Sequence, residues 1–269
     1  ATDVSAQLGA GDFSVGVEDG SLAMLLAADN SIALSATGSF VFEGGDFANA
    51  SATLVTVSLN DSSTDYAATP LTISIDGVSA DLNAGLGAES VSVVGLAIDI
   101  SGFVSLGGNF GFRITGTDIE VAATDVSAQL AAGDFSVGVE NGSLAMLLAA
   151  DNSIALSATG TFVFEGGDFA NASATLVTVS LNDSTTDYAA TPLTIAIDGV
   201  SADLTAGLNI QSVSVVGLAI DISGFVSLGG DFGFRITENN IEVAATDVVA
   251  QLAAGDFSVG VENGSLAML

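Results

Sequence analysis

The sequence predicts an all-β protein built from antiparallel strands and hairpins in directly stacked repeats. Three observations lead to this prediction. A near-identical unit recurs after 122 residues, apolar side chains alternate along the chain with a period of two, and short turn signals separate the alternating stretches. We expect a solenoid-like elongated array, in which repeats pack directly on one another, with tandem β-sandwiches as the alternative.

The repeat is visible without gaps. The motif "ATDVSAQL" starts at Ala1 and again at Ala123, and "ATDVVAQL" starts at Ala245. Of 122 aligned positions, 109 are identical and 13 differ. We therefore expect a first β repeat over 1–122, a second over 123–244 and the start of a third over 245–269, so that the chain is a window of a longer array.

Six of the 13 differences fall in two short runs, which we expect to be surface turns because packing constrains sequence least there. The runs are 87–89 against 209–211 and 116–118 against 238–240.

Alternation and turn residues predict the individual strands. Ile32, Leu34, Phe40 and Phe42 lie on one side of a period-two pattern, and a similar pattern covers 94–100. Segments rich in Gly, Asn and Asp are typical of tight turns, since these residues tolerate positive φ. The predicted turns are 18–21, 28–31, 44–46, 76–77 and 116–118. The repeat boundary falls inside a strand-like run, 119–130, which argues against a flexible linker between repeats.

Composition excludes several functions. The chain has 2 Lys plus Arg against 32 Asp plus Glu, a net charge of −30, and no His, Cys or Trp. Nucleic-acid binding needs clustered cations, so we expect no nucleic-acid partner. We also expect no transmembrane segment, because no apolar run reaches 18 residues. Without His or Cys, the usual general base and thiol nucleophile are missing, and we expect no enzymatic activity.

Calcium is the one cofactor that the sequence suggests. Hard cations bind carboxylate and carbonyl oxygens, and the chain has one dense run of such residues in each repeat. The candidate ligands are Asn60, Asp61 and Asp65 in the first repeat, and Asn182, Asp183 and Asp187 in the second. The alternative is that these side chains only cap turns, as Asp and Asn commonly do.

The two arginines, Arg113 and Arg235, occupy equivalent positions in the repeated motif "FGFRIT". One interpretation is an ion pair across a hairpin with a neighbouring carboxylate, such as Glu120 or Glu242. The other is a charge pair at a contact between repeats or between chains.

The segment "ATDVSAQLAAGDFSVGVENGSLAML", recurring every 122 residues in an acidic, Cys-free chain, resembles the long tandem-repeat surface and extracellular-matrix fibre proteins of bacteria, including large adhesins. This resemblance implies export to the cell surface or biofilm matrix, extension away from the cell, and often stiffening by calcium. We expect a non-catalytic structural region that associates with copies of itself into a filament. The alternative is the extender region of an adhesin whose binding tip lies outside this window.

Overall fold

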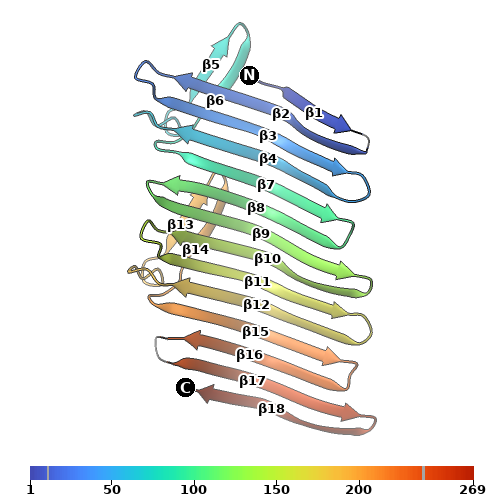
Figure 1. Cartoon of the computed structure of the whole chain (residues 1–269). Coiled ribbons are helices and arrows are strands. Elements are labelled where there is room, and N and C mark those ends of the chain that lie inside the picture. The colour runs from blue at the N-terminus through green and yellow to red at the C-terminus, as the bar shows by residue number, and fades with distance from the viewer. Residues whose placement is uncertain (11, 238–239) are drawn as a thin grey trace. The chain divides into compact units, whose positions relative to one another are not determined.

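The computed structural model describes residues 1–10, 12–237 and 240–269. The described residues form eighteen strands and no helix, which confirms the all-β antiparallel prediction (Figure 1). Fourteen strands make one open sheet, and the other four make two separate hairpins. The described part of the chain therefore has no helix that is long and apolar enough to cross a membrane.

The strands of the large sheet are β1 (Val4–Ala10), β2 (Phe13–Leu26), β3 (Ile32–Gly44), β4 (Asn49–Asn60), β7 (Glu89–Ile100), β8 (Val104–Thr115), β9 (Asp118–Ala132), β10 (Phe135–Leu148), β11 (Ile154–Gly166), β12 (Ala170–Asn182), β15 (Ile210–Ile222), β16 (Val226–Ile236), β17 (Ile241–Ala254) and β18 (Phe257–Met268). The two hairpins consist of β5 (Leu71–Ile75) with β6 (Val78–Leu82), and β13 (Leu193–Ile197) with β14 (Val200–Leu204).

Sheet order follows chain order, except that a hairpin is inserted after β4 and another after β12. Strand β9 continues through the boundary between residues 122 and 123, so the two repeats meet inside a strand. The alternative of tandem β-sandwiches is wrong, because strands of both repeats belong to one sheet.

The chain forms two compact units, which do not coincide with the sequence repeats. The first unit consists of Ala1–Thr124, Leu147–Asp151 and Ile195–Ala202. The second consists of Asp125–Met146, Asn152–Thr194 and Asp203–Leu269. The tip of the second repeat's hairpin therefore packs within the first unit.

The predicted turns at 28–31, 44–46, 76–77 and 116–118 are confirmed. The predicted turn at 18–21 is wrong, because β2 continues through it and only a β-bulge interrupts its pairing with β3. At the bulge Asp19 has a φ of 52°, in the left-handed region that a single Asp tolerates. Of the variable runs, Gly87 and Asn209 lie in turns, but the prediction is wrong for Glu89, which begins β7, and for 210–211, which begin β15; residues 238–239 lie outside the described residues.

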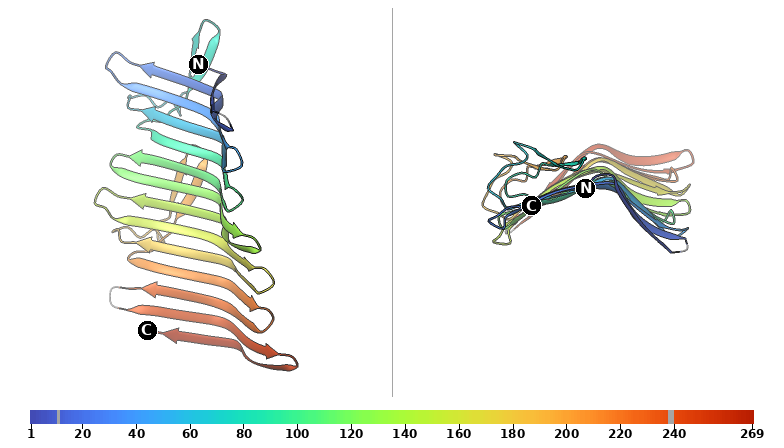
Figure 2. Two further views of the ribbon diagram at one scale, coloured as in Figure 1. Left: turned by 45° about the vertical axis from the view of Figure 1, so that its right-hand side comes forward. Right: turned by 90° about the horizontal axis from the view of Figure 1, so that it is seen from above.

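In the first unit the bulges lie at similar heights on neighbouring strands, and the strands bend there (Figure 2). Gly95 shows why the sequence has glycine at one of them. Its φ is 64°, and an added Cβ would lie 2.5 Å from the Thr53 Oγ1 atom on the adjacent strand. No other residue fits this site without displacing that side chain.

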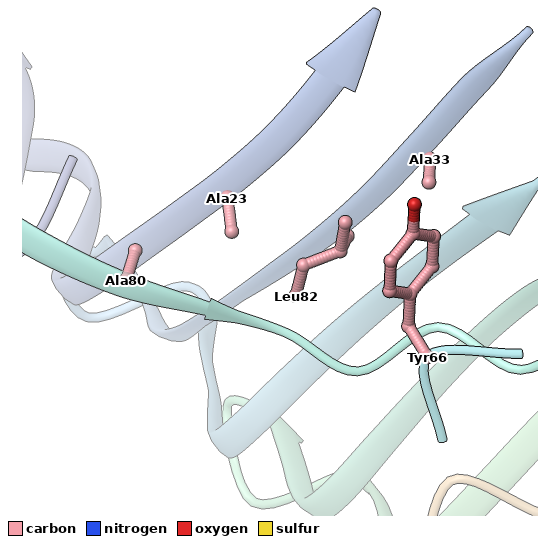
Figure 3. Packing of buried hydrophobic residues seen from close by; sticks show 5 residues of the cluster. All are labelled: Ala23, Ala33, Tyr66, Ala80 and Leu82. Carbon is pink, nitrogen blue, oxygen red and sulfur yellow. The ribbon is translucent and has the colours of Figure 1, made fainter. Parts of the chain in front are cut away.

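The core of the first unit lies where the β5–β6 hairpin crosses one face of the sheet. Leu82 and Tyr66, from the hairpin and the loop before it, point towards Ala23 and Ala33 on β2 and β3 (Figure 3). Alanine on the sheet lets the hairpin approach closely, and Leu82 is fully buried as a result. Away from the hairpins, many large apolar side chains of the sheet remain exposed.

Candidate docking site between repeats

A buried asparagine holds the loop from which each hairpin starts. The Asn60 side-chain amide donates hydrogen bonds to the backbone oxygens of Thr64 (2.8 Å) and Ala84 (3.0 Å). Its Oδ1 atom accepts hydrogen bonds from the backbone N–H (3.1 Å) and the hydroxyl (2.7 Å) of Ser62. Asn182 makes the equivalent four bonds in the second repeat. Because both asparagines are buried and fully bonded, they fix the path of the chain into the hairpin.

The aspartates of the same loop also bond to the backbone. Asp61 Oδ1 accepts the backbone N–H of Ile32 on the neighbouring strand. Asp65 Oδ1 accepts two backbone N–H groups, two and three residues further along, at 3.0 and 3.2 Å. Asp183 and Asp187 make the same contacts. Among the described residues, no group of three or more acidic side chains is placed to hold a metal ion. The structure leaves calcium binding by this loop untested, and the bonds to the backbone are those that the turn-capping alternative predicts.

A chelator experiment separates turn capping from calcium binding. One carboxylate oxygen of each of these aspartates already accepts backbone hydrogen bonds, so we expect the loop to keep its structure without a metal. Melting followed by circular dichroism should give the same Tm in calcium and in excess EGTA. A clear fall in Tm with EGTA, reversed by added calcium, would instead establish a calcium site.

The turn between β2 and β3 contains a carboxylate with a shifted pKa. Asp29 Oδ1 accepts hydrogen bonds from the Ser31 hydroxyl (2.7 Å) and from the Ser31 backbone N–H (3.0 Å). These bonds favour the charged form and lower the pKa of Asp29 below its ordinary value. Their stabilising effect is therefore present above the ordinary pKa and is lost as the pH falls through the lowered one.

The β13–β14 hairpin reaches its site through a tight two-residue turn. Asp198 and Gly199 have φ angles of 45° and 93°, and this pair of positive values is typical of an Asp-Gly hairpin turn. Three apolar side chains next to the turn are almost completely buried: Ile195 (0% exposed), Ile197 (2%) and Val200 (1%). The tip is thus seated in the first unit by apolar contact.

Polar groups of β7 and β8 bind the backbone and the turn of this tip. Ser90 Oγ donates to Asp198 Oδ2 at 2.7 Å, and Ser92 Oγ donates to the backbone oxygen of Asp198 at 3.4 Å. Arg113 Nη1 donates to the backbone oxygen of Ala196 at 2.8 Å. These bonds orient the tip across the two strands.

Arg113 also forms the predicted ion pair with Glu120, including a hydrogen bond of 2.7 Å from Nε. Arg235 pairs with Glu242 in the same way. Arg113 therefore confirms the ion pair across a hairpin, and its contact with the second repeat is a hydrogen bond to the backbone oxygen of Ala196 and not a second charge pair.

Glycine on β8 makes room for the tip. A Cβ added at Gly111 would lie 2.8 Å from Ile197 Cβ and 3.3 Å from the Ile197 backbone oxygen. Its counterpart Gly233 has no such atom within 4 Å. Gly111 therefore makes room for Ile197, whereas its counterpart Gly233 has no neighbouring side chain to make room for.

We expect Gly111→Ala to destabilise the protein by about 1–3 kcal/mol, because the new methyl group overpacks the contact with Ile197. Gly233→Ala is the matched control and should change the free energy of unfolding by less than about 0.5 kcal/mol. Urea denaturation of the two variants measures both effects. Equal effects of the two substitutions would contradict the docking geometry.

The contact consists of a hairpin tip and the strand residues that bind it. The chain has a second copy of each, and these second copies do not contact one another. The tip of the β5–β6 hairpin has the same apolar residues as the docked tip, but Ile75 is 66% exposed and Val78 is 48% exposed. In the second unit, a groove of about 570 Å³ lies over β15, β16, β17 and the end of β18. Its lining includes Ser212, Ser214 and Arg235, the counterparts of the residues that bind the docked tip.

The sequence singled out the arginines but not the hairpin tip or the serines that bind it. A near-identical repeat gives no sign of which copy of a contact is filled. The available signal was the Asp-Gly turn flanked by Ile and Val, which predicts a hairpin with an apolar tip.

Comparison with known proteins identifies no relative of this chain. No protein-family model matches the chain, and neither the curated proteins nor the solved structures contain a match.

Proposed function

We propose that this chain is the structural, non-catalytic repeat region of an extracellular filament or cell-surface fibre. The observation that carries this proposal is the continuity of β9, which runs from Asp118 to Ala132 through the boundary between repeats. Near-identical sequence repeats that share one sheet, with no linker between them, supply length and stiffness. Nothing in that arrangement requires a catalytic group.

The exposed surface supports association between chains. Many large apolar side chains on the sheet are exposed, among them Leu22, Met24 and Phe112. Exposed apolar surface on this scale marks an interaction surface in proteins that fold and stay in solution.

Charge and sheet edges set the conditions for such association. The net charge of −30 makes chains repel one another at low ionic strength, and salt screens this repulsion. The sequence has no Lys, a residue that commonly blocks pairing at an exposed sheet edge. Self-association should therefore strengthen as the salt concentration rises.

Electron microscopy and light scattering at low and high ionic strength test the proposal. We expect filaments that become longer or more numerous with salt. Met24→Lys places a charge among the exposed apolar side chains of the sheet, where Met24 is 56% exposed, and should reduce assembly without lowering the Tm. Monodisperse single chains at every ionic strength would overturn the proposed function.

A further inference from the structure

The docked tip and the empty groove contain the two halves of one contact. In the first unit, the tip Ile195–Ala202 is bound by Ser90, Ser92, Gly111 and Arg113. All four binding residues recur in the second repeat, as Ser212, Ser214, Gly233 and Arg235. We define the β15–β16 groove by these four counterparts together with Phe234, which also lines it.

We propose that the β15–β16 groove binds the hairpin tip of another copy of this repeat, in the geometry that the docked tip already shows. The contact joins repeats head to tail with a fixed polarity, because each repeat offers a groove on one side and a tip on the other. The proposal deepens the proposed function by naming the surface through which repeats interlock.

The free tip matches the docked tip at every position that the contact uses. Between 73–80 and 195–202 a single residue differs, Ser74 against Ala196. At that position the bound group is the backbone oxygen, which accepts a hydrogen bond from Arg113, so the side chain is not part of the contact. We expect Arg235 to donate to the Ser74 oxygen, and Ser212 and Ser214 to bind Asp76.

The groove has the exposure expected of an unfilled site. The Arg235 side chain is 55% exposed against 33% for Arg113, and Glu242 is 31% exposed against 13% for Glu120. Ser92 is completely buried under the docked tip, whereas Ser214 is half-buried. Filling the groove would remove apolar surface of Ile75 and Val78 from water, which is the main favourable contribution to such a contact.

A hairpin peptide is the appropriate probe. Residues 1–25 of a second whole chain have nearly the same sequence as 245–269, so its first two strands would compete with β17 and β18 for one place. In the β5–β6 hairpin, Leu71 and Leu82 are cross-strand partners. The probe is therefore the sequence Leu71–Leu82 closed into a ring by a D-Pro-Gly turn, with Ile75→Cys.

Disulfide trapping detects even a short-lived complex. The chain has no Cys, so Gly233→Cys in the full chain introduces a single thiol. At the docked site the corresponding Cβ atoms approach to 2.8 Å, well within the reach of a disulfide once the chains relax slightly. The control is Ser258→Cys, an exposed position on β18 outside the groove. Mass spectrometry in a glutathione buffer follows the mixed disulfide.

We expect the probe to couple to Gly233→Cys at least tenfold faster than to Ser258→Cys. Adding Arg235→Ala to the Gly233→Cys chain should slow coupling, since the peptide loses a donor for its backbone oxygen. Equal coupling at the two thiols, or coupling unaffected by Arg235→Ala, would overturn the docking proposal. Filaments that form although coupling is unselective would leave the proposed function standing. Selective coupling by a chain that stays monomeric would overturn that function alone.

Discussion

Ile197→Asp is expected to destabilise the protein by about 3–5 kcal/mol, because it places an unpaired carboxylate in a buried apolar contact. Ile197 is 2% exposed and lies against Gly111 at the docked tip. The hairpin should detach rather than bury the charge, so Ile195 and Val200 lose their contacts as well. Urea denaturation followed by circular dichroism measures the loss.

The matched control is Ile75→Asp, the same substitution at the equivalent position of the first repeat. Ile75 is 66% exposed, and a charge there stays in water. We expect a change within about 0.5 kcal/mol. If the two variants were equally stable, the second hairpin would not be docked as described.

Leu204→Ala is expected to cost about 2–5 kcal/mol, the range for truncating a fully buried leucine. Leu204 is the last residue of β14 and is 0% exposed. Its counterpart Leu82 packs on Ala23 and Ala33 of the sheet. The isopropyl group removed leaves a cavity between hairpin and sheet that small alanines cannot fill. Denaturant titration should show a lower midpoint.

Leu86→Ala serves as the control for this truncation, because it removes the same atoms from a leucine that is 62% exposed. Its effect should stay within about 0.5 kcal/mol. A Leu204→Ala variant as stable as Leu86→Ala would show that the hairpin does not depend on its packing against the sheet.

Period-two alternation and the near-identical repeat were sufficient to predict the all-β fold, and the strand-like run 119–130 predicted β9. The failure at 18–21 has a local cause. Asp19-Gly20 has the composition of a hairpin turn, but Asp19 takes up its positive φ inside a bulge while β2 continues to Leu26. Turn residues fix a local φ, whereas strand pairing decides whether the chain reverses.

The docking site was less predictable, because its two halves are far apart in the sequence. Arg113 could be singled out as a rare cation, and its ion pair with Glu120 followed from hairpin spacing. Its bond to Ala196, 83 residues away, depends on where the hairpin falls across the sheet. In the sequence, nothing distinguishes Ser90 and Ser92 from other polar residues of a strand. Only the position of the tip over them shows that they bind it.

Hydrogen–deuterium exchange read by mass spectrometry compares the two tips directly within one molecule. Residues 73–80 and 195–202 differ at one position, so their peptides have different masses but nearly equal intrinsic exchange rates. Docking in the first unit predicts that amides of 195–202 exchange at least about tenfold more slowly than those of 73–80. At an ionic strength at which the chain is monomeric, equal exchange at the two tips would contradict the docking of residues 195–202 on which the docking proposal rests.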